Sequence, residues 1–370
     1  MKYAIRITIG VLLALSFVIG AASAQETPNV QNVYYMAADS AGVQQIYQLP
    51  LDGQSAARQI THAAQDVITF GAAYDGLSVA YISAGQLWLQ PIHTDTPEAL
   101  APVSAVQFFS GPVFSLDGQY IAYADRGAWL LDLSTRQSRQ ILADVPVDET
   151  GSNADQFRIF MPYRFATDAE GHAAQLLVRI GVWEWQTAGV YDLASGQLQE
   201  LSGHVHNNLL PLSDGRVLVY GNNGMDGHPG LSIAASLSDV NTYSDILDFT
   251  ALTDATLFAE QAVETAPGRI RIFGPALDPA NPGERVFFFD VDLAAGTASA
   301  VRILNLSDGI SMNTVAGDLS PDGRIVPVYL GALWTDAGSI YGRFQLHDLD
   351  ADAVMPVAFP ETVGVFRWKP

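Results

Sequence analysis

A short pattern in which an Asp-Gly pair separates two apolar runs recurs along the chain, and it constrains the fold more than any other feature. Glycine adopts positive φ without strain, so Asp-Gly between apolar runs is a strong signal for a β-hairpin. The spacing of about 40 to 55 residues between copies predicts a fold built by repeating one supersecondary unit. The four clearest copies and two weaker ones contain the pairs Asp75-Gly76, Asp117-Gly118, Asp214-Gly215, Asp322-Gly323, Glu170-Gly171 and Pro267-Gly268.

Each copy contains further strand-like segments after its hairpin. The second apolar run carries Tyr81, Tyr123 or Tyr220 six residues after the aspartate, and Val328 takes that place in the fourth clear copy. A third run ends near an aspartate, and a fourth, more polar run has the character of an edge strand. Examples of these two runs are 129–133 with 138–142, and 190–193 with 197–201. Four short antiparallel strands per unit are typical of the blades of a β-propeller.

The two ends of the chain complete the repeat. Residues 364–370 have the pattern of a first strand without its turn, and residues 33–36, 45–49 and 58–61 have the pattern of the other three strands. Joined in one sheet, they would close a ring without a free sheet edge. We therefore expect an all-β fold, a single propeller of seven blades closed by its N- and C-terminal strands, with six blades as the fallback. A β-sandwich or a β-helix fits less well, because neither keeps a four-stranded unit of this length along the whole chain.

Three segments carry a family resemblance. They are Ser320-Pro321-Asp322-Gly323-Arg324, the run from Ser115 to Tyr123, and the segment from Ile46 to Thr61 that contains Leu51-Asp52-Gly53. These segments resemble the TolB-type, WD40-like bacterial propeller repeat, and the similarity extends over nearly the whole chain after residue 24. The resemblance implies a β-propeller. In that family such repeats occur in envelope scaffolds and as domains attached to peptidases, so the resemblance implies no particular chemistry.

The N-terminus has the features of a secretory signal peptide. Lys2 and Arg6 provide a basic start, residues 7–19 form an apolar run, and Ala22-Ser23-Ala24 matches a cleavage site. The apolar run is short for a membrane span, and an uncleaved membrane anchor is the alternative interpretation. We expect residues 1–24 to be removed and residues 25–370 to form the propeller domain. That domain would be secreted or periplasmic, outside the cytoplasm and without a membrane span after cleavage.

The charge balance limits the partners that the chain can have. It holds 39 acidic residues against 18 Lys and Arg, for a formal net charge of −21, and it has no cysteine. Nucleic acid is not an expected partner, because neutralising its phosphates needs Lys and Arg. A basic partner or a cation fits this charge better, although the acidity can also serve solubility alone. The absence of cysteine excludes disulfides, thiolate metal sites and a cysteine nucleophile.

Strand connectivity divides the turns of such a propeller between two faces. In an antiparallel four-stranded blade, the Asp-Gly turns and the third-to-fourth turns lie on one face. The second-to-third loops and the connections between blades lie on the other, which we call the loop face. Loops on a rigid scaffold often carry binding residues, and this face gathers acids, tryptophans and histidines. The candidate binding residues are His62, Trp183, Trp185, His204, His206, Asn222, Asp226, His228, Trp334 and Asp336.

These residue types also have structural interpretations. Aspartate caps its own backbone in turns. That chemistry would account for the loop aspartates Asp39, Asp125, Asp226, Asp278 and Asp336. Tryptophan rings can equally cover the apolar cores of blades, and histidines in connections are commonly hydrogen-bonded turn residues. The composition of the loop face therefore favours a binding surface without identifying its ligand.

Signals for specific chemistry are weak. The segment from Asn222 to Gly227 resembles an oxygen-ligand calcium loop in part, but it lacks the alternating carboxylates and the distal glutamate. His204 and His206 would lie on the same side of a strand and could pair on a metal, yet no third ligand is identifiable. No cofactor is therefore expected, with calcium as a weak possibility. The short motifs of serine hydrolases, zinc proteases and phosphate-binding loops do not occur in the sequence.

Together these patterns predict an exported, non-catalytic binding or scaffold propeller that contacts a protein or a saccharide through its loop face. The alternative is an extracytoplasmic enzyme that acts on carbohydrate or peptide in the central channel. The 39 acidic residues offer many carboxylate pairs for such chemistry, and only geometry would select one. The absence of a catalytic motif favours the first interpretation, and the sequence assigns no catalytic residue.

Overall fold

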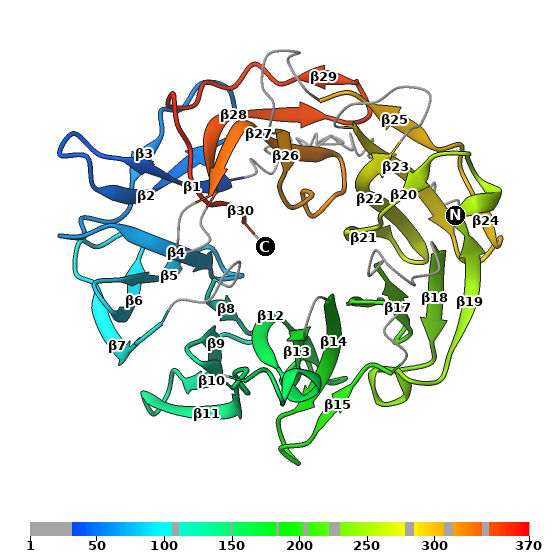
Figure 1. Cartoon of the computed structure of the whole chain (residues 1–370). Helices are drawn as coiled ribbons and strands as arrows, with labels where there is room; N and C mark the ends of the chain where they lie inside the picture. The colour runs from blue at the N-terminus through cyan, green and yellow to red at the C-terminus, as the bar shows by residue number, and fades with distance from the viewer. Residues whose placement is uncertain are drawn as a thin grey trace, which may run out of the picture. The chain divides into compact units, whose positions relative to one another are not determined.

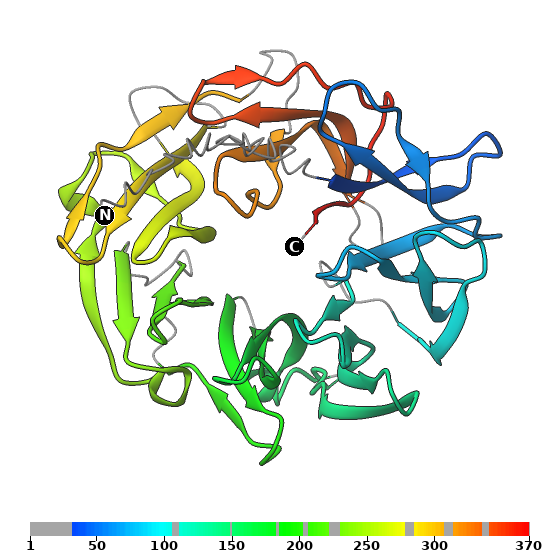
Figure 2. The same cartoon turned by 180° about the vertical axis from the view of Figure 1, so that it is seen from behind.

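The computed structural model describes residues 32–105, 111–148, 150–182, 185–202, 206–221, 230–277, 285–306, 314–334 and 340–369. These residues form seven antiparallel sheets, arranged as blades around a common axis (Figure 1, and from behind in Figure 2). The predicted all-β propeller of seven blades is confirmed, and the fallback of six blades is wrong. Within the described ranges there is no helix with the length and apolar character needed to cross a membrane.

Blades 1 to 4 follow one another along the chain, except that the C-terminal strand joins blade 1. Blade 1 consists of β30 (Phe366–Trp368), β1 (Asn32–Ala38), β2 (Gln44–Pro50) and β3 (Arg58–Gln59). Blade 2 consists of β4 (Val67–Ala72), β5 (Ser78–Ser83), β6 (Gln86–Pro91) and β7 (Glu98–Pro102). Blade 3 consists of β8 (Val113–Phe114), β9 (Tyr120–Ala124), β10 (Gly127–Asp132) and β11 (Gln137–Ala143). Blade 4 consists of β12 (Ile159–Thr167), β13 (Ala173–Val182), β14 (Trp185–Asp192) and β15 (Leu198–Glu200).

Blades 5 and 7 are regular, whereas blade 6 has divided strands. Blade 5 consists of β16 (Asn208–Pro211), β17 (Val217–Tyr220), β18 (Gly230–Ala234) and β19 (Tyr243–Asp248). In blade 6, β20 (Thr256–Leu257) and β21 (Gln261–Ala266) both pair with β22 (Arg269–Leu277), while β24 (Thr297–Ala298) and β25 (Arg302–Leu304) both pair with β23 (Arg285–Asp292). Blade 7 consists of β26 (Thr314–Ala316), β27 (Ile325–Trp334), β28 (Ile340–Asp348) and β29 (Ala353–Val354). Single 3-10 turns occur at η1 (Ala154–Gln156), η2 (Leu237–Asp239) and η3 (Phe249–Ala251).

The repeated glycine turns join the first and second strands of blades 2 to 7, as the sequence pattern predicts. The glycine of each of these turns has φ between 69° and 87°, at Gly76, Gly118, Gly171, Gly215, Gly268 and Gly323. A residue with a Cβ seldom adopts this conformation. Glycine is therefore the residue that each turn requires, and its recurrence in the sequence marks the position of each blade.

The second strands are buried because each blade packs between two neighbouring blades. Tyr81 of β5 and Tyr123 of β9 are each only 2% exposed. Their rings stack on Trp88 and Trp129 of the adjacent third strands, with ring centroids 6.4 and 6.1 Å apart. Strands with both faces covered read as nearly continuous apolar runs, which is the pattern that follows each Asp-Gly pair.

Strands from both chain ends close the ring in blade 1. Strand β30 pairs antiparallel with β1, so that Val33 lies opposite Trp368 and Tyr35 lies opposite Phe366 (Figure 1). Just before β30, the amide of Met36 donates to the carbonyl oxygen of Val365 at 2.9 Å. The predicted closure is therefore confirmed. It pairs the strand edges that an open ring would leave exposed.

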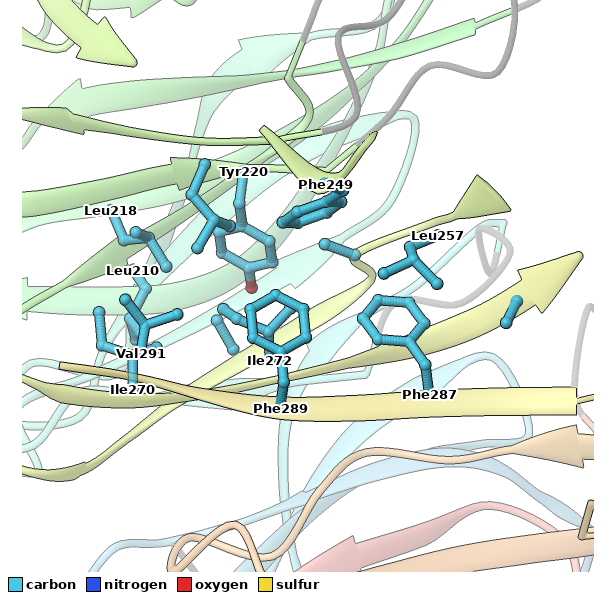
Figure 3. Close-up of a cluster of buried hydrophobic side chains, with 14 of the residues drawn as sticks. Leu210, Leu218, Tyr220, Phe249, Leu257, Ile270, Ile272, Phe287, Phe289 and Val291 are labelled. Carbon is cyan, nitrogen blue, oxygen red and sulfur yellow. The ribbon is translucent and has the colours of Figure 1, made fainter. Parts of the chain in front are cut away.

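The hydrophobic core lies in the interfaces between blades. Between blades 5 and 6, Phe249 of η3 packs among Phe287, Phe289 and Tyr220 (Figure 3). The Phe249 and Phe289 rings meet edge to face with centroids 5.5 Å apart. Burial of one such side chain contributes roughly 1.5–3 kcal/mol to stability. Many such contacts hold the blades in fixed positions around the axis, which makes their inner strands a rigid wall.

Candidate functional site

The innermost strands of all seven blades line a central channel with a cavity volume of about 520 Å³. Ligand sites in proteins commonly have volumes of roughly 300 to 1,000 Å³. Among the described residues, the part of the wall formed by blades 2 and 3 carries no charged side chain, whereas blades 4, 6, 7 and 1 supply charged groups. Those charged residues are Arg164, Arg179, Glu260, Asp318 and Arg367.

Arg179 is held in the channel wall by neutral partners. Its Nε and Nη2 atoms donate to Oδ1 of Asn208 at 3.3 and 3.1 Å. Its guanidinium carbon lies 5.4 Å from the centroid of the Tyr163 ring, an arrangement in which the ring face attracts a cation. The Tyr163 hydroxyl in turn donates to the carbonyl oxygen of Leu209 at 3.3 Å. These contacts orient the guanidinium without placing a described carboxylate within ion-pair distance of it.

Arg164 lies half-buried in the same wall, on β12. Among the described residues, neither Arg164 nor Arg179 has a carboxylate within the 4.0 Å of an ion pair. Arg271, on the outer part of blade 6, shows the contrast, since it pairs with both Asp290 and Asp350 at 2.8 Å. Guanidinium groups stay charged in proteins, so the two channel arginines form a positive site open to an anion.

Glu260 reaches the channel because the first strand of blade 6 is interrupted. It lies between β20 and β21, where its amide still donates to the carbonyl oxygen of Phe273 at 3.1 Å. Gly274 of β22 permits this close approach, because a Cβ there would overlap the carbonyl oxygen of Phe258. The interruption and the glycine together position the carboxylate in the wall.

The wall raises the pKa of the Glu260 carboxyl group. Desolvation is the largest cause, the charge of Asp318 adds to it, and the charge of Arg179 opposes it. The side chain is open to the channel, yet protein surrounds the channel, so little bulk water is available to stabilise the ionised form. No described residue donates a hydrogen bond to this carboxylate. Glu260 is therefore a carboxyl group able to take up a proton more readily than a surface glutamate.

Tyrosines of the channel wall remain neutral at physiological pH. Burial raises the pKa of Tyr163, Tyr220 and Tyr329 above the ordinary phenol value. Their hydroxyl groups can therefore exchange hydrogen bonds but carry no charge. In the part of the wall that the structure describes, the charge comes from arginine and carboxylate side chains.

The closing strand also contributes to the channel. Arg367 of β30 lies 3.7 Å from Oδ2 of Asp318, which follows β26. The indole nitrogen of Trp368 donates to the carbonyl oxygen of Asp318 at 2.6 Å. Gln261 of blade 6 donates to the carbonyl oxygen of Gly317 at 2.9 Å. Ring closure and this part of the channel therefore depend on the same residues.

Two of the predicted histidines can be placed in full. His62 is exposed on the connection from blade 1 to blade 2, with Nδ1 3.1 Å from Nε2 of Gln59. His206 is buried, with Nδ1 3.2 Å from the carbonyl oxygen of Gly221 and Nε2 3.1 Å from Oγ of Ser232. Neither histidine lines the channel. Both ring nitrogens of His206 already have partners, so its role in the structure is to join neighbouring segments of blade 5.

The other predicted loop-face residues are described in part or not at all. The backbone of Trp185 begins β14 and that of Trp334 ends β27, while their side chains lie outside the description. Their backbones belong to blades 4 and 7, whereas His62 lies on the connection from blade 1 to blade 2. The candidates that lie outside the described residues are Trp183, His204, Asn222, Asp226, His228 and Asp336. The expectation of no cofactor, with calcium at Asn222–Gly227 as the alternative, is therefore not tested, and neither is a His204–His206 metal pair.

Two loop aspartates have structural roles, and one of them, Asp39, caps its own turn as the structural interpretation predicts, whereas Asp125 bonds a different segment. Asp39 accepts the amides of Ala41 and Val43 at 2.8 and 3.0 Å, the pattern of a self-capped turn. Asp125 accepts the amide and the hydroxyl group of Ser104 at 3.0 and 2.7 Å, which ties its turn to the connection between blades 2 and 3. Their carboxylates hold loops in place.

The channel residues were missed because the sequence reasoning concentrated on loops. A usable signal existed in the strands. Arg164 stands between Tyr163 and Phe165, and Arg179 stands between Val178 and Ile180, within otherwise apolar runs. A charged residue inside a strand that is covered on both faces must have a special environment. In a propeller, the channel is one such environment.

Comparisons with known proteins identify the fold and no family. No protein-family model matches the chain, and no curated protein matches its sequence. An oligogalacturonate lyase from Vibrio parahaemolyticus has 11% identity and a TM-score of 0.50, over 87% of this chain and 83% of the other. A structure of oligogalacturonate lyase in complex with manganese also has 11% identity and a TM-score of 0.50, over 88% and 84%.

TolB from Acinetobacter baumannii is also similar, with 14% identity and a TM-score of 0.43. The match covers 74% of this chain and 65% of the length of that TolB chain. At these identities the likeness to solved structures concerns the fold alone. The seven blades of the described residues agree with the resemblance of the sequence to the TolB-type, WD40-like repeat.

Proposed function

We propose that this chain is an extracytoplasmic, non-catalytic binding propeller whose central channel holds an anionic ligand. The observation that carries the proposal is the pair of channel arginines, Arg164 and Arg179, which have no carboxylate partner among the described residues. Acidic residues outnumber basic ones by 39 to 18, so the chain has ample acids to neutralise an arginine. Two arginines left unpaired in a cavity of ligand size favour an incoming anion as their partner.

The chemistry of the wall suits this ligand class. A guanidinium group presents planar donors that match the two oxygens of a carboxylate. Water competes less for these donors inside a walled channel than on an open surface, which strengthens the contact. Asn208 and Tyr163 hold Arg179 in place before any ligand arrives, so little side-chain ordering remains to oppose binding.

Export and the loop face belong to the same proposal. Residues 1–24 would direct the chain out of the cytoplasm, and the loop face would contact a protein or saccharide partner. Of the candidates on that face, His62 has a described and exposed side chain. The channel and the loop face would then provide two separate contact surfaces on one scaffold.

Titration calorimetry on the purified protein tests the channel. Triglutamate and trigalacturonate serve as acidic probes, while triglutamine and methyl-esterified trigalacturonate serve as neutral counterparts. We expect acidic probes to bind and neutral ones not to bind. Arg164→Gln should weaken binding about tenfold or more, because it removes a charged donor. Arg139→Gln, on the exposed outer strand β11, removes an equal charge elsewhere and should change nothing. Equal binding of neutral probes, or an unchanged affinity in Arg164→Gln, would contradict the proposal.

A second candidate function is catalysis in the same channel, and Glu260 favours it. A carboxyl group with a raised pKa beside an arginine is able to exchange protons with a substrate. Because a solved structure with this fold is an oligogalacturonate lyase, galacturonate oligomers belong among the substrates tested. Turnover by the wild type that Glu260→Gln abolishes would support an enzyme. If the protein binds acidic saccharides or peptides but does not convert them, the result would support the binding function instead.

A further inference from the structure

Arg164, Arg179 and Glu260 line the same channel, so an anion that binds to the two arginines enters the cavity that holds the Glu260 carboxylate. Glu260 has no direct hydrogen-bond or ion-pair partner for its carboxylate among the described residues, and the charge of Arg179 is the main influence that favours its ionised form. Desolvation and the charge of Asp318 oppose ionisation. The two unfavourable effects outweigh the one favourable charge, so the pKa of Glu260 is raised.

The other titratable groups around Glu260 cannot substitute for it near neutral pH. Burial raises the pKa of the Tyr163 and Tyr220 phenols in the neighbouring wall, so both stay protonated. Asp318 lies in the same wall, with Oδ2 3.7 Å from Nη1 of Arg367. Arginine side chains in general stay protonated in proteins. The pKa of the Glu260 carboxyl group is already raised, and a further negative charge in the channel would raise it more.

We propose that the channel takes up one proton on the Glu260 carboxylate when a ligand carboxylate binds to Arg164 and Arg179. This inference rests on the proposed function, since it requires an anion in the channel. It adds a ligand class, carboxylate-bearing saccharides or peptides, and a pH dependence of their binding. No covalent bond changes, and the proton comes from solvent.

The physical reason is competition for one cation. A ligand carboxylate on Arg179 cancels the charge that favours ionised Glu260 and places a like charge nearby. Both effects favour the protonated carboxyl group. Once protonated, Glu260 has an O–H group, which donates a hydrogen bond to the ligand oxygen where an ionised carboxylate would repel it. Binding and protonation therefore promote each other.

Calorimetry in buffers of different ionisation enthalpy measures the protons that are taken up on binding. The side-chain carboxyl groups of triglutamate and trigalacturonate are mostly ionised from about pH 5 to about pH 8, and we expect a net uptake of at most one proton per ligand. Kd should rise with pH in this range, by at most about tenfold per unit. Glu260→Gln resembles the protonated state, so it should bind tightly at all these pH values with no uptake from this position. Thermal melts of each variant confirm that it is folded.

The outcomes separate this inference from the proposed function. Proton uptake that Glu260→Gln abolishes supports both. Binding that depends on Arg164 but shows no uptake, or uptake that persists in Glu260→Gln, overturns the inference and leaves the channel as an anion site. Failure of both acidic probes to bind at any of these pH values overturns both. Binding of one acidic probe alone identifies the source of the carboxylate, saccharide or peptide, and its proton uptake then decides the inference.

Discussion

Arg179 of blade 4 donates two hydrogen bonds to one atom of blade 5, Oδ1 of Asn208, at 3.3 Å from Nε and 3.1 Å from Nη2. The acceptor is a neutral amide in a place where a carboxylate of the same shape would fit. The contact crosses a blade interface, so the packing of the two blades determines where the guanidinium points. The contact with Asn208 fixes the position of the guanidinium charge and leaves that charge available to a ligand.

Asn208→Asp tests this relationship. The substitution keeps the shape of the side chain and supplies Arg179 with a counter-ion, which should weaken binding of triglutamate about tenfold or more. Titration calorimetry measures the loss, and a thermal melt checks the fold. Asn241→Asp, between blades 4 and 5 but away from the channel, serves as the control for an added negative charge. An affinity that is unchanged in Asn208→Asp would show that the Arg179 charge does not hold the ligand.

Glu260→Gln should stabilise the unliganded protein at neutral pH and have no such effect in acid. The folded-state pKa of Glu260 is raised, so its contribution favours folding below the unfolded-state value of about 4.3 and is lost as the pH rises through the folded-state value. Glutamine stays uncharged at every pH, so the variant does not lose this contribution to stability as the pH rises. In thermal melts, the variant should therefore have a higher Tm than the wild type at about pH 8, and the same Tm at about pH 4. A Tm difference of the same size at both pH values would mean that desolvation of the Glu260 carboxylate is not the cause of the stabilisation.

Gly274→Ala should displace the segment that carries Glu260. A Cβ at this position overlaps the carbonyl oxygen of Phe258, so β22 and the interrupted first strand must separate. We expect a loss of about 1–3 kcal/mol in the free energy of unfolding and a smaller proton uptake on binding triglutamate. Gly181→Ala is the matched control, because its Cβ would meet Ile159 at an ordinary 3.5 Å. Equal effects of the two substitutions would contradict this account of how Glu260 is positioned.

Asp117→Ala should cost more stability than the equivalent change at Asp75, although both residues occupy the same place in the repeat. Asp75 accepts the amide of Leu77 within its own turn at 2.8 Å. Asp117 also accepts the amide of Ala173 in blade 4 at 2.8 Å, which ties two blades together. Although desolvation opposes it, hydrogen bonding to Asp117 holds its pKa below the usual range.

We expect a loss of about 1–2 kcal/mol in the free energy of unfolding for Asp117→Ala and a smaller loss for Asp75→Ala, measured by denaturant unfolding. The difference should narrow in acid, because stability from a lowered carboxyl pKa is present above the unfolded-state value and is lost as the pH falls through the folded-state value. Equal losses near neutral pH would show that the bond to Ala173 contributes nothing.

The blade repeat could be predicted because its signals are local. A turn that needs positive φ selects glycine at Gly76 and its equivalents whatever surrounds the turn, and a strand covered on both faces selects an apolar run. The closing strand of 364–370 was also predictable, since an unpaired first strand at one end and three strands at the other can satisfy each other only in one sheet.

The candidate site was not predictable in the same way. Arg164 and Arg179 lie on one hairpin of blade 4, but Glu260 of blade 6 and Asp318 of blade 7 are far from them in the sequence, and no spacing rule connects the three blades. Their proximity depends on the angle and order of packed blades. The pKa of Glu260 depends on desolvation and on charges from two other blades.

Sequence alone therefore determined that this chain is a propeller of four-stranded repeats, because turn conformation and strand burial act on a few neighbouring residues. The tertiary structure decided which charges share the channel, that the Arg179 charge meets an amide where an acid could have stood, and that desolvation raises the pKa of Glu260. Electrostatic environment is a sum over groups brought together by the closed ring, so it exists only once the ring has formed.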